Sequence, residues 1–218
     1  NDTNKYKFFN HDTTFYEFKK LMGKKIDDEN IIFERQYLIY DLTSDEHQNV
    51  NVQCNDKKLT PEELSSYILI KLKQLASVHF KGKDIVDAVI SVPAYFNDVQ
   101  RQATLDAAKI AGLNCLRLIG EPIASALAFG LDKMTQDMYV VVYDLGGGTL
   151  DISLLNITNG IFEVVATAGN AHLGGVDFDN KIFEYCMSTF KNQHNLPNSV
   201  VMSIDKIQEL RKISEYCK

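Results

Sequence analysis

The spacing of hydrophobic and polar positions predicts alternating helices and strands between residues 60 and 130. Thr60 and Glu63 fit a capping box, and Pro61 suits the first position of the helix that follows. Apolar positions then recur at helical spacing towards Phe80. The further predicted elements are a strand over Asp87–Val92, a helix over Asp98–Ala111, a strand over Cys115–Ile119 and a helix over Glu121–Phe129. This order is typical of an α/β layer.

The pattern changes after residue 137. Three apolar runs follow one another through tight turns, over Met138–Tyr143, Leu150–Ile157 and Ile161–Ala168, and they predict an antiparallel meander. A helix over Asp177–His194 and another that begins near Ser203 complete the chain. The second part of the chain therefore differs in architecture from the first.

The first sixty residues are more polar and predict less regular structure. Thr14 and Glu17 fit a capping box for a short helix that Gly23 would close. The stretch Val50–Lys58 predicts a hairpin at a sheet edge. The polar step Lys133–Asp137 is the expected boundary between two parts of the molecule.

Composition and charge narrow the classes of function. The 218 residues are 45% hydrophobic and 24% charged, with a net charge of -6, so no global positive field attracts nucleic acid or an anionic membrane. No apolar run reaches the roughly 18 residues that suggest a membrane span. The four cysteines show no CxxC spacing and the five histidines no ligand spacing, which favours reduced thiols and no zinc site. The chain has no initiator methionine and its last residues resemble mid-helix, so we expect the native chain to be longer at both ends.

A glycine-rich turn is the most informative segment. Gly146, Gly147 and Gly148 let the backbone approach a ligand closely, and successive N–H groups in such a turn form a nest for an anion. Asp144 and Asp151 flank the turn and can hold a hydrated Mg²⁺ against a phosphate. No GK[ST] follows, so this is not the lysine-containing phosphate loop. A glycine hairpin without a ligand is the alternative.

Three further positions have both a functional and a structural interpretation. Gly174 and Gly175 precede a helix whose N-terminus could bind phosphate or simply be capped. Glu121 follows a strand, where it could position a water molecule or complement the helix dipole. Lys19 on its own is typical of a solvated cation at a helix end.

Together these segments resemble the seventy-kilodalton heat-shock protein family of molecular chaperones, in family order over nearly all of the chain. The segments that carry the resemblance are Phe18–Gly23, Val92–Asp98, Gln100–Thr104, Ala111–Asn114, Glu121–Pro122, Gly130–Lys133, Asp144–Asp151 and His172–Asp179. The resemblance is densest between residues 60 and 180 and weak between 31 and 53.

The resemblance implies an actin-like, ribonuclease H-like ATPase fold of two lobes around a nucleotide cleft, incomplete at both ends. The first lobe would comprise residues 1–134, with an outer subdomain of about 1–62 and an inner one of about 63–134 that lacks its first phosphate hairpin. Residues 135–218 would begin the second lobe, with an inner subdomain of about 135–173 and a truncated outer one of about 174–218.

The resemblance also assigns roles to individual residues. Lys19, Glu121, Asp144 and Asp151 match catalytic positions, and the two aspartates match the metal site. Pro93 and Arg101 match a pair that relays nucleotide state between lobes. The nucleotide-binding positions are Gly146, Gly147, Gly148, Thr149, Gly174, Gly175, Glu215 and Lys218. The implied cofactors are ATP or ADP with Mg²⁺, and K⁺ as a further cation.

The family further implies hydrolysis of ATP that controls the binding of unfolded polypeptide through a separate domain. J-domain co-chaperones and nucleotide exchange factors would be its partners, without nucleic acid or membrane. Cytoplasm is the expected compartment, with the endoplasmic reticulum lumen left open. We expect the 218 residues alone to be inactive.

Six positions depart from the family pattern and leave alternatives open. They are Leu105, Gly120, Ile123, Asn170, Ala171 and Val176. Ile123, Asn170 and Val176 favour a non-catalytic relative that binds nucleotide as a co-chaperone or exchange factor, whereas Lys19 and Glu121 oppose it. A sugar kinase or filament protein of the same fold is a third hypothesis, and the segments Val92–Asp98 and His172–Gly175 argue against it.

Overall fold

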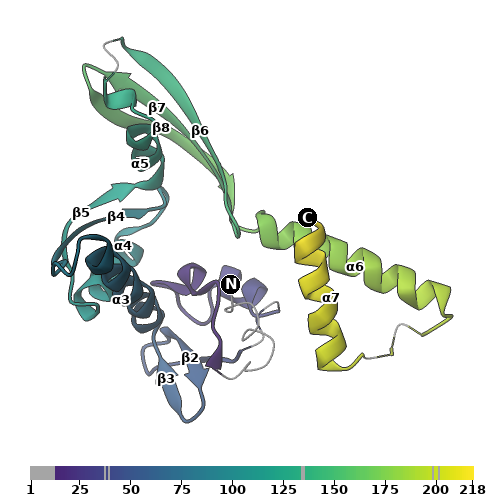
Figure 1. Cartoon of the computed structure of the whole chain (residues 1–218). Helices are drawn as coiled ribbons and strands as arrows, with labels where there is room; N and C mark the ends of the chain where they lie inside the picture. Colours follow the sequence, from purple (N-terminus) through teal and green to yellow (C-terminus); the bar gives the residue numbers. More distant parts are fainter. Residues whose placement is uncertain (1–12, 37, 39, 134–135, 198, 201) are drawn as a thin grey trace. The chain divides into compact units, whose positions relative to one another are not determined.

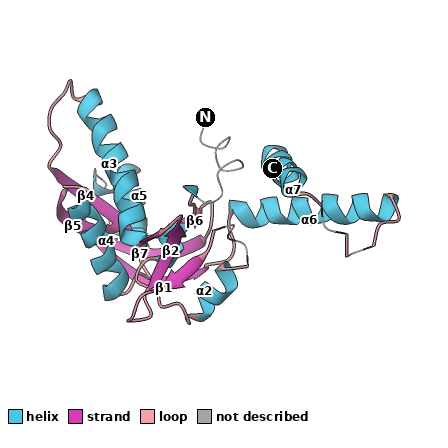
Figure 2. Cartoon of the chain, turned by 90° about the horizontal axis from the view of Figure 1, so that it is seen from below, coloured by secondary structure: helices cyan, strands magenta, loops and turns pink. Residues whose placement is uncertain are grey.

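The computed structural model describes residues 13–36, 38, 40–133, 136–197, 199–200 and 202–218. The chain divides into two compact units, Asn1–Ala124 and Ser125–Lys218 (Figure 1). Both units combine helices and strands (Figure 2). Within the described ranges, no helix is long and apolar enough to cross a membrane.

The first unit opens with a small antiparallel sheet. Its order is β1-β2-β3, formed by Leu42–Ser44, Val50–Cys54 and Lys57–Leu59. The β2–β3 hairpin confirms the prediction over Val50–Lys58, whereas strand β1 and helix α2 (Glu29–Glu34) were not predicted. The sequence there lacks a clear apolar period, and tertiary contacts decide the conformation.

The predicted capping box at Thr14 is wrong. The helix there is a single 3₁₀ turn, η2 (Phe18–Leu21), and its N-cap is Glu17 in the left-handed conformation, without a side-chain cap. Gly23 follows it with φ +63°, as predicted for a closing glycine. Burial explains the short helix, because Leu21 inserts between the small sheet and the helices that follow.

A hydrophobic core joins η2, α2 and one face of the small sheet. Its buried members are Leu21, Ile31, Tyr40, Leu42, Val50, Val52 and Leu64. Phe15 and Tyr16 pack their rings edge-on against Tyr40. Burial of this apolar surface, rather than helix propensity, holds the irregular first sixty residues in place.

The α/β layer follows as predicted. Helix α3 (Pro61–His79) has the expected capping box, in which Thr60 Oγ1 accepts from the Glu63 N–H at 3.1 Å and the Glu63 carboxylate accepts from the Thr60 N–H at 2.8 Å. After α3, the layer continues with β4 (Asp87–Val92), α4 (Asp98–Ile110), β5 (Asn114–Gly120) and α5 (Glu121–Ala128). Strands β4 and β5 pair in parallel, so α4 is the crossover helix of a βαβ unit.

The second unit is the predicted meander followed by two helices. Strands β6 (Met138–Leu145), β7 (Leu150–Thr158) and β8 (Ile161–Asn170) pair antiparallel in that order. Helix α6 (Gly175–Gln193) and helix α7 (Ile204–Cys217) follow. A 3₁₀ turn, η3 (Leu131–Lys133), precedes the meander.

The division into units falls ten residues before the lobe boundary that was expected between residues 134 and 135, within the polar segment. That segment, Lys133–Asp137, includes residues 134 and 135, which lie outside the described residues. The assignment of residues 1–134 and 135–218 to two lobes, with their subdomains, stays a prediction.

We expect the capping box of α3 to contribute measurably to stability. Thr60→Ala removes an acceptor of the helix N-terminus, and we expect it to cost about 1 kcal/mol of unfolding free energy. Ser77→Ala is the control, because Ser77 lies within the same helix and its side chain has no hydrogen-bond partner among the described residues. Urea unfolding followed by circular dichroism measures both; equal midpoints for the two variants would contradict the assignment.

Candidate functional site

Lys19 and Glu121 meet in the first unit although 102 residues separate them. Lys19 Nζ lies 2.7 Å from Glu121 Oε1, with side-chain exposures of 61% for the lysine and 23% for the glutamate. Lys19 comes from η2, and Glu121 is the first residue of α5, directly after β5. The pair places a cation beside a carboxylate at the end of a parallel strand, where open α/β sheets bind ligands.

Pro93 and Arg101 lie at the two ends of one loop-and-helix segment in the same unit. The Arg101 guanidinium donates from Nε to the Phe96 carbonyl at 2.9 Å and from Nη2 to the Ala94 carbonyl at 3.4 Å. Arg101 therefore fixes the backbone that follows Pro93. The Asn97 cap of α4 supports the same loop, because Asn97 Oδ1 accepts from the Gln100 N–H at 2.9 Å.

The glycine turn of the second unit connects β6 to β7. Asp144 and Asp151 are directly opposite each other in the β6–β7 register, so their carboxylates flank the base of the turn on one face of the sheet. Thr149 Oγ1 donates to Asp151 Oδ2 at 2.8 Å, which orients that carboxylate. Among the described residues, the N–H groups of Gly147 and Gly148 have no hydrogen-bond acceptor, so both are available to an anion.

The second glycine pair packs against this turn, backbone to backbone. A Cβ on Gly174 would lie 2.5 Å from the Gly148 carbonyl carbon and 2.6 Å from its nitrogen. The Gly175 and Val176 N–H groups donate to the carbonyls of Gly146 and Gly147 at 3.0 and 2.8 Å. Only glycine fits at position 174 without displacing the turn.

These hydrogen bonds decide the role of the α6 N-terminus. The Asp177 carboxylate accepts a hydrogen bond from the Gly174 N–H at 2.7 Å. The N–H groups of Gly175 and Val176 already donate to carbonyls of the glycine turn. The N-terminus of α6 is therefore capped and structural at this point, and Gly174 and Gly175 act as a wall that shapes the turn rather than as anion donors.

Lys218 approaches the same place from α7. Its Nζ lies 3.0 Å from the Gly175 carbonyl oxygen and 3.0 Å from Asp179 Oδ2. Glu215 lies three residues earlier, with an exposed side chain. The sequence identifies Asp179 only as an acid near the start of α6, and no local signal could have paired it with a lysine 39 residues away.

The residues at the turn fit a hydrated divalent cation, although they do not form a complete metal cage. The described part of the chain has no group of three or more histidine, cysteine or acidic residues that could hold a metal ion by themselves. Mg²⁺ usually keeps several waters and takes one or two carboxylates together with phosphate oxygens. Two opposed aspartates beside an anion nest match that requirement.

Asn170 and Val176 depart from the expected pattern near these glycines, and both preserve the local backbone. Asn170 Oδ1 accepts from the His172 N–H at 2.8 Å, a bond that a carboxylate would also make. Val176 contributes its N–H group to the contact with Gly147, which does not depend on its side chain. Ile123 lies in α5, two residues after Glu121.

The fold and the site define the class of protein: an α/β protein with a glycine turn that suits phosphate and is flanked by two carboxylates. Comparison with known proteins gives the family. The sequence model of the Hsp70 protein family matches residues 2–218, and the chain belongs to this family. The Hsp70 ATPase domain has the actin-like fold, which confirms the fold class expected from the sequence.

Curated relatives give the same result. The chain is 46% identical over 211 residues to "Chaperone protein dnaK1" of Synechocystis sp., an alignment that covers 96% of this chain and 30% of the relative. It is 46% identical over 208 residues to "Chaperone protein dnaK" of Cyanidium caldarium, covering 94% and 32%. It is 43% identical over 217 residues to "Heat shock protein 70 homolog" of Acanthamoeba polyphaga mimivirus, covering 93% and 22%. The chain therefore spans about a third or less of the length of these relatives.

We expect the close approach at Gly174 to be sensitive to one added methyl group. Gly174→Ala forces the glycine turn away from α6, and overpacking of this kind costs about 1–3 kcal/mol. The control is Gly147→Ala, because a Cβ there meets no atom within 4 Å. Thermal unfolding of both variants tests the contact; a Gly174→Ala variant as stable as Gly147→Ala would show that the turn is not held by this packing.

Proposed function

We propose that this chain belongs to the ATP-binding and ATP-hydrolysing region of an Hsp70-type chaperone that uses nucleotide turnover to control the binding of unfolded polypeptide. The observation that carries the proposal is the Lys19–Glu121 pair at 2.7 Å, formed by two distant segments that family resemblance assigns to the attacking water. Membership of the Hsp70 family supports it.

The second unit would hold the phosphates. The N–H groups of Gly147 and Gly148 donate to phosphate oxygens, and Thr149 keeps the Asp151 carboxylate in place through its 2.8 Å hydrogen bond. Asp144 and Asp151 would hold Mg²⁺ through its waters, and the bound ion supplies charge neutralisation to the phosphates. Lys218 and Glu215 are the proposed contacts to adenosine at the end of α7.

The first unit would supply the groups that act on water. Glu121 accepts a hydrogen bond from the attacking water and orients it, and the Lys19 ammonium stabilises negative charge that develops on the γ-phosphate. Their ion pair keeps both side chains aligned before substrate binds. The reaction is an in-line transfer of a phosphoryl group to water, and positioning rather than covalent chemistry lowers the barrier.

Partners and compartment follow from the same proposal. Unfolded polypeptides would be the clients of the whole protein, with J-domain co-chaperones and nucleotide exchange factors as regulators. We place the protein in the cytoplasm and add K⁺ as a second cation near the phosphates. Pro93 and Arg101 would relay nucleotide state, because Arg101 fixes the backbone after Pro93 through two carbonyl contacts.

A non-catalytic relative that binds nucleotide remains the second candidate. Ile123 supports it, because this apolar residue lies in the first turn of α5, two residues after Glu121, where the family usually has threonine. Nucleotide binding without turnover by the full-length protein would decide for this candidate.

Turnover tests the catalytic proposal. In the full-length protein we expect Lys19→Ala to lower the rate of ATP hydrolysis by roughly a hundredfold or more, because a charge used in the transition state is lost. Lys109→Ala removes an exposed lysine of α4 and should leave the rate unchanged. Single-turnover phosphate release measures both; equal rates in the two variants would exclude Lys19 from the chemistry.

Nucleotide binding has a separate test that does not depend on turnover. We expect Mg²⁺-ADP to raise the thermal stability of the full-length protein, by about 2.7 kcal/mol at a hundredfold excess over Kd. Removal of Mg²⁺ with a chelator, or Asp144→Asn, should reduce the shift, since both remove the proposed cation link. A stable protein without any shift would contradict nucleotide binding at this turn.

A further inference from the structure

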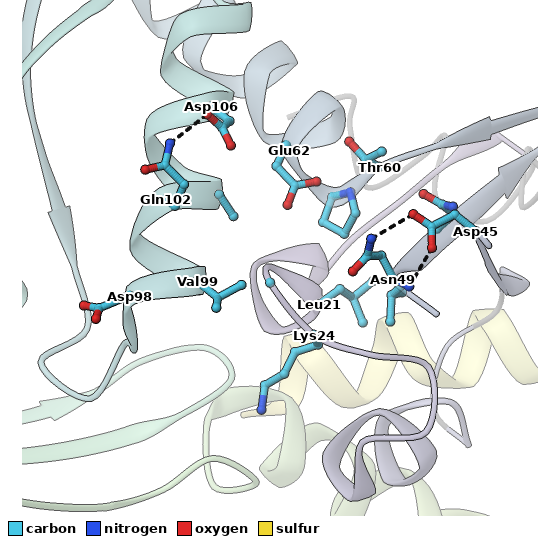
Figure 3. Close-up of a pocket in the computed structure, with 15 residues that line it drawn as sticks. Leu21, Lys24, Asp45, Asn49, Thr60, Glu62, Asp98, Val99, Gln102 and Asp106 are labelled. Atoms are coloured by element: carbon cyan, nitrogen blue, oxygen red, sulfur yellow. Dashed lines mark hydrogen bonds between the residues drawn. The ribbon is translucent and has the colours of Figure 1, made fainter. Parts of the chain in front are cut away.

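A pocket of about 540 Å³ opens in the first unit, and neither Lys19 nor Glu121 lines it (Figure 3). Its walls come from α4, from the first residues of α3 and from the β1–β2 hairpin of the small sheet. All of these elements belong to one compact unit. The pocket contributes nothing to the nucleotide chemistry proposed above, so its lining requires its own explanation.

The floor of the pocket contains Asn51, a buried residue whose side chain makes no hydrogen bond to another described residue. Asn51 in β2 is 7% exposed and lines the pocket, and its neighbours Val50 and Val52 belong to the hydrophobic core. Thr43 is directly opposite Asn51 in the β1–β2 register, and its Oγ1 is buried. Thr43 Oγ1 has no hydrogen-bond partner among the described residues, but Thr43 does not line the pocket. Asn51 does line it, and its amide is not among the fully enclosed atoms, so the amide is reached from the pocket and is available to a ligand or water there.

The pocket is also negatively charged. Figure 3 shows the Glu62 side chain between the α4 residues and the Asp45–Asn49 pair, with Asp106 on the wall formed by α4. Asp106 Oδ1 accepts from Gln102 at 2.9 Å, which leaves its second oxygen available. Hydrogen bonds from Asn49 hold the pKa of Asp45 below its usual range, so this carboxylate is charged as well.

The basic residue of the lining does not neutralise this charge. Lys24 extends away from the labelled carboxylates in Figure 3, and its Nζ lies 2.9 Å from Asp28 Oδ2, outside the pocket. Within the described part of the chain, Glu62 and Asp106 have no cationic partner. An anionic ligand is therefore disfavoured here, in contrast with the glycine turn of the second unit.

Apolar residues line the rest of the pocket. They are Leu21, Val50, Pro61, Val99 and Ala103. A ligand that suits the whole pocket combines a short apolar stem with a cationic head that donates several hydrogen bonds. A guanidinium group has five N–H donors in a planar fork that matches carboxylates, and its methylene stem packs on apolar surface.

We propose that this pocket binds a guanidinium group, carried either by a small molecule or by an arginine side chain of a polypeptide. Glu62 and Asp106 pair with the head through charge-assisted hydrogen bonds, and the Asn51 side-chain oxygen accepts a further N–H. The apolar residues contact the stem. A compact ammonium offers fewer directed donors and satisfies this lining less completely.

The test uses the full-length protein and two probes that separate the sources of the group. Agmatine represents a small guanidinium compound, and the blocked tripeptide acetyl-Ala-Arg-Ala-amide represents a polypeptide. Isothermal titration calorimetry measures the affinity of each probe. The citrulline tripeptide is the neutral isostere and should not bind. Binding of agmatine with or without the peptide identifies a small-molecule site, and binding of the peptide alone identifies a polypeptide site.

Matched variants connect binding to this pocket. We expect Glu62→Gln and Asp106→Asn each to weaken binding of the active probe by about tenfold, the effect of one charge-assisted hydrogen bond. Asp56→Asn removes one exposed carboxylate of the β2–β3 turn, outside the pocket, and should leave the affinity unchanged. Thermal unfolding confirms that each variant is folded. If neither probe binds, if the citrulline peptide binds equally well, or if the pocket variants bind as Asp56→Asn does, the proposal is wrong.

Discussion

The backbone contact between the glycine turn and Gly174 is the constraint on which the arrangement of the second unit depends. It joins the end of β6, the start of β7 and the first turn of α6 through hydrogen bonds from Gly175 and Val176 to turn carbonyls. Since those carbonyls face α6, the turn presents its remaining N–H groups elsewhere, which is the requirement for an anion nest. Lys218 donates to the Gly175 carbonyl at the same place, at 3.0 Å.

A second close approach has the same role in the first unit. A Cβ at Gly23 would lie 3.0 Å from both Cα and N of Gln100, so η2 can rest on the first turn of α4 only because this position is glycine. Gln100 is itself fixed by the Asn97 capping box. Lys19 is thereby positioned through α4, while Glu121 is positioned through the β4–β5 pairing. The ion pair between them joins two independently supported segments.

Local signals predicted most elements, and long-range contacts explain the failures. The caps at Thr60 and Asn97 are complete within four residues, so the sequence defines α3 and α4 well. Thr14 and Glu17 carry the same local signal, yet burial of Leu21 limits the helix there to one 3₁₀ turn. The apolar spacing of α3 correctly predicts a helix, but Ile68, Leu72 and Leu75 on it are exposed, because periodicity does not say which surface covers them.

The same distinction applies to the site. The resemblance to the family assigns Lys19 and Glu121 to the same reaction, and the structure brings the two side chains together. No sequence pattern could pair Lys218 with Asp179. No sequence pattern indicated the pocket in the first unit either, because Asn51 is simply a polar position in the apolar–polar alternation of β2. Its significance appears only when Thr43 lies opposite and Glu62 lies on the wall above. A chain of net charge -6 thus has two local fields: backbone N–H groups that suit an anion, and carboxylates that suit a cation. An anion that suits the glycine turn is repelled by the carboxylates of the pocket, so the local lining, and not the net charge of the chain, decides which ligand the pocket takes.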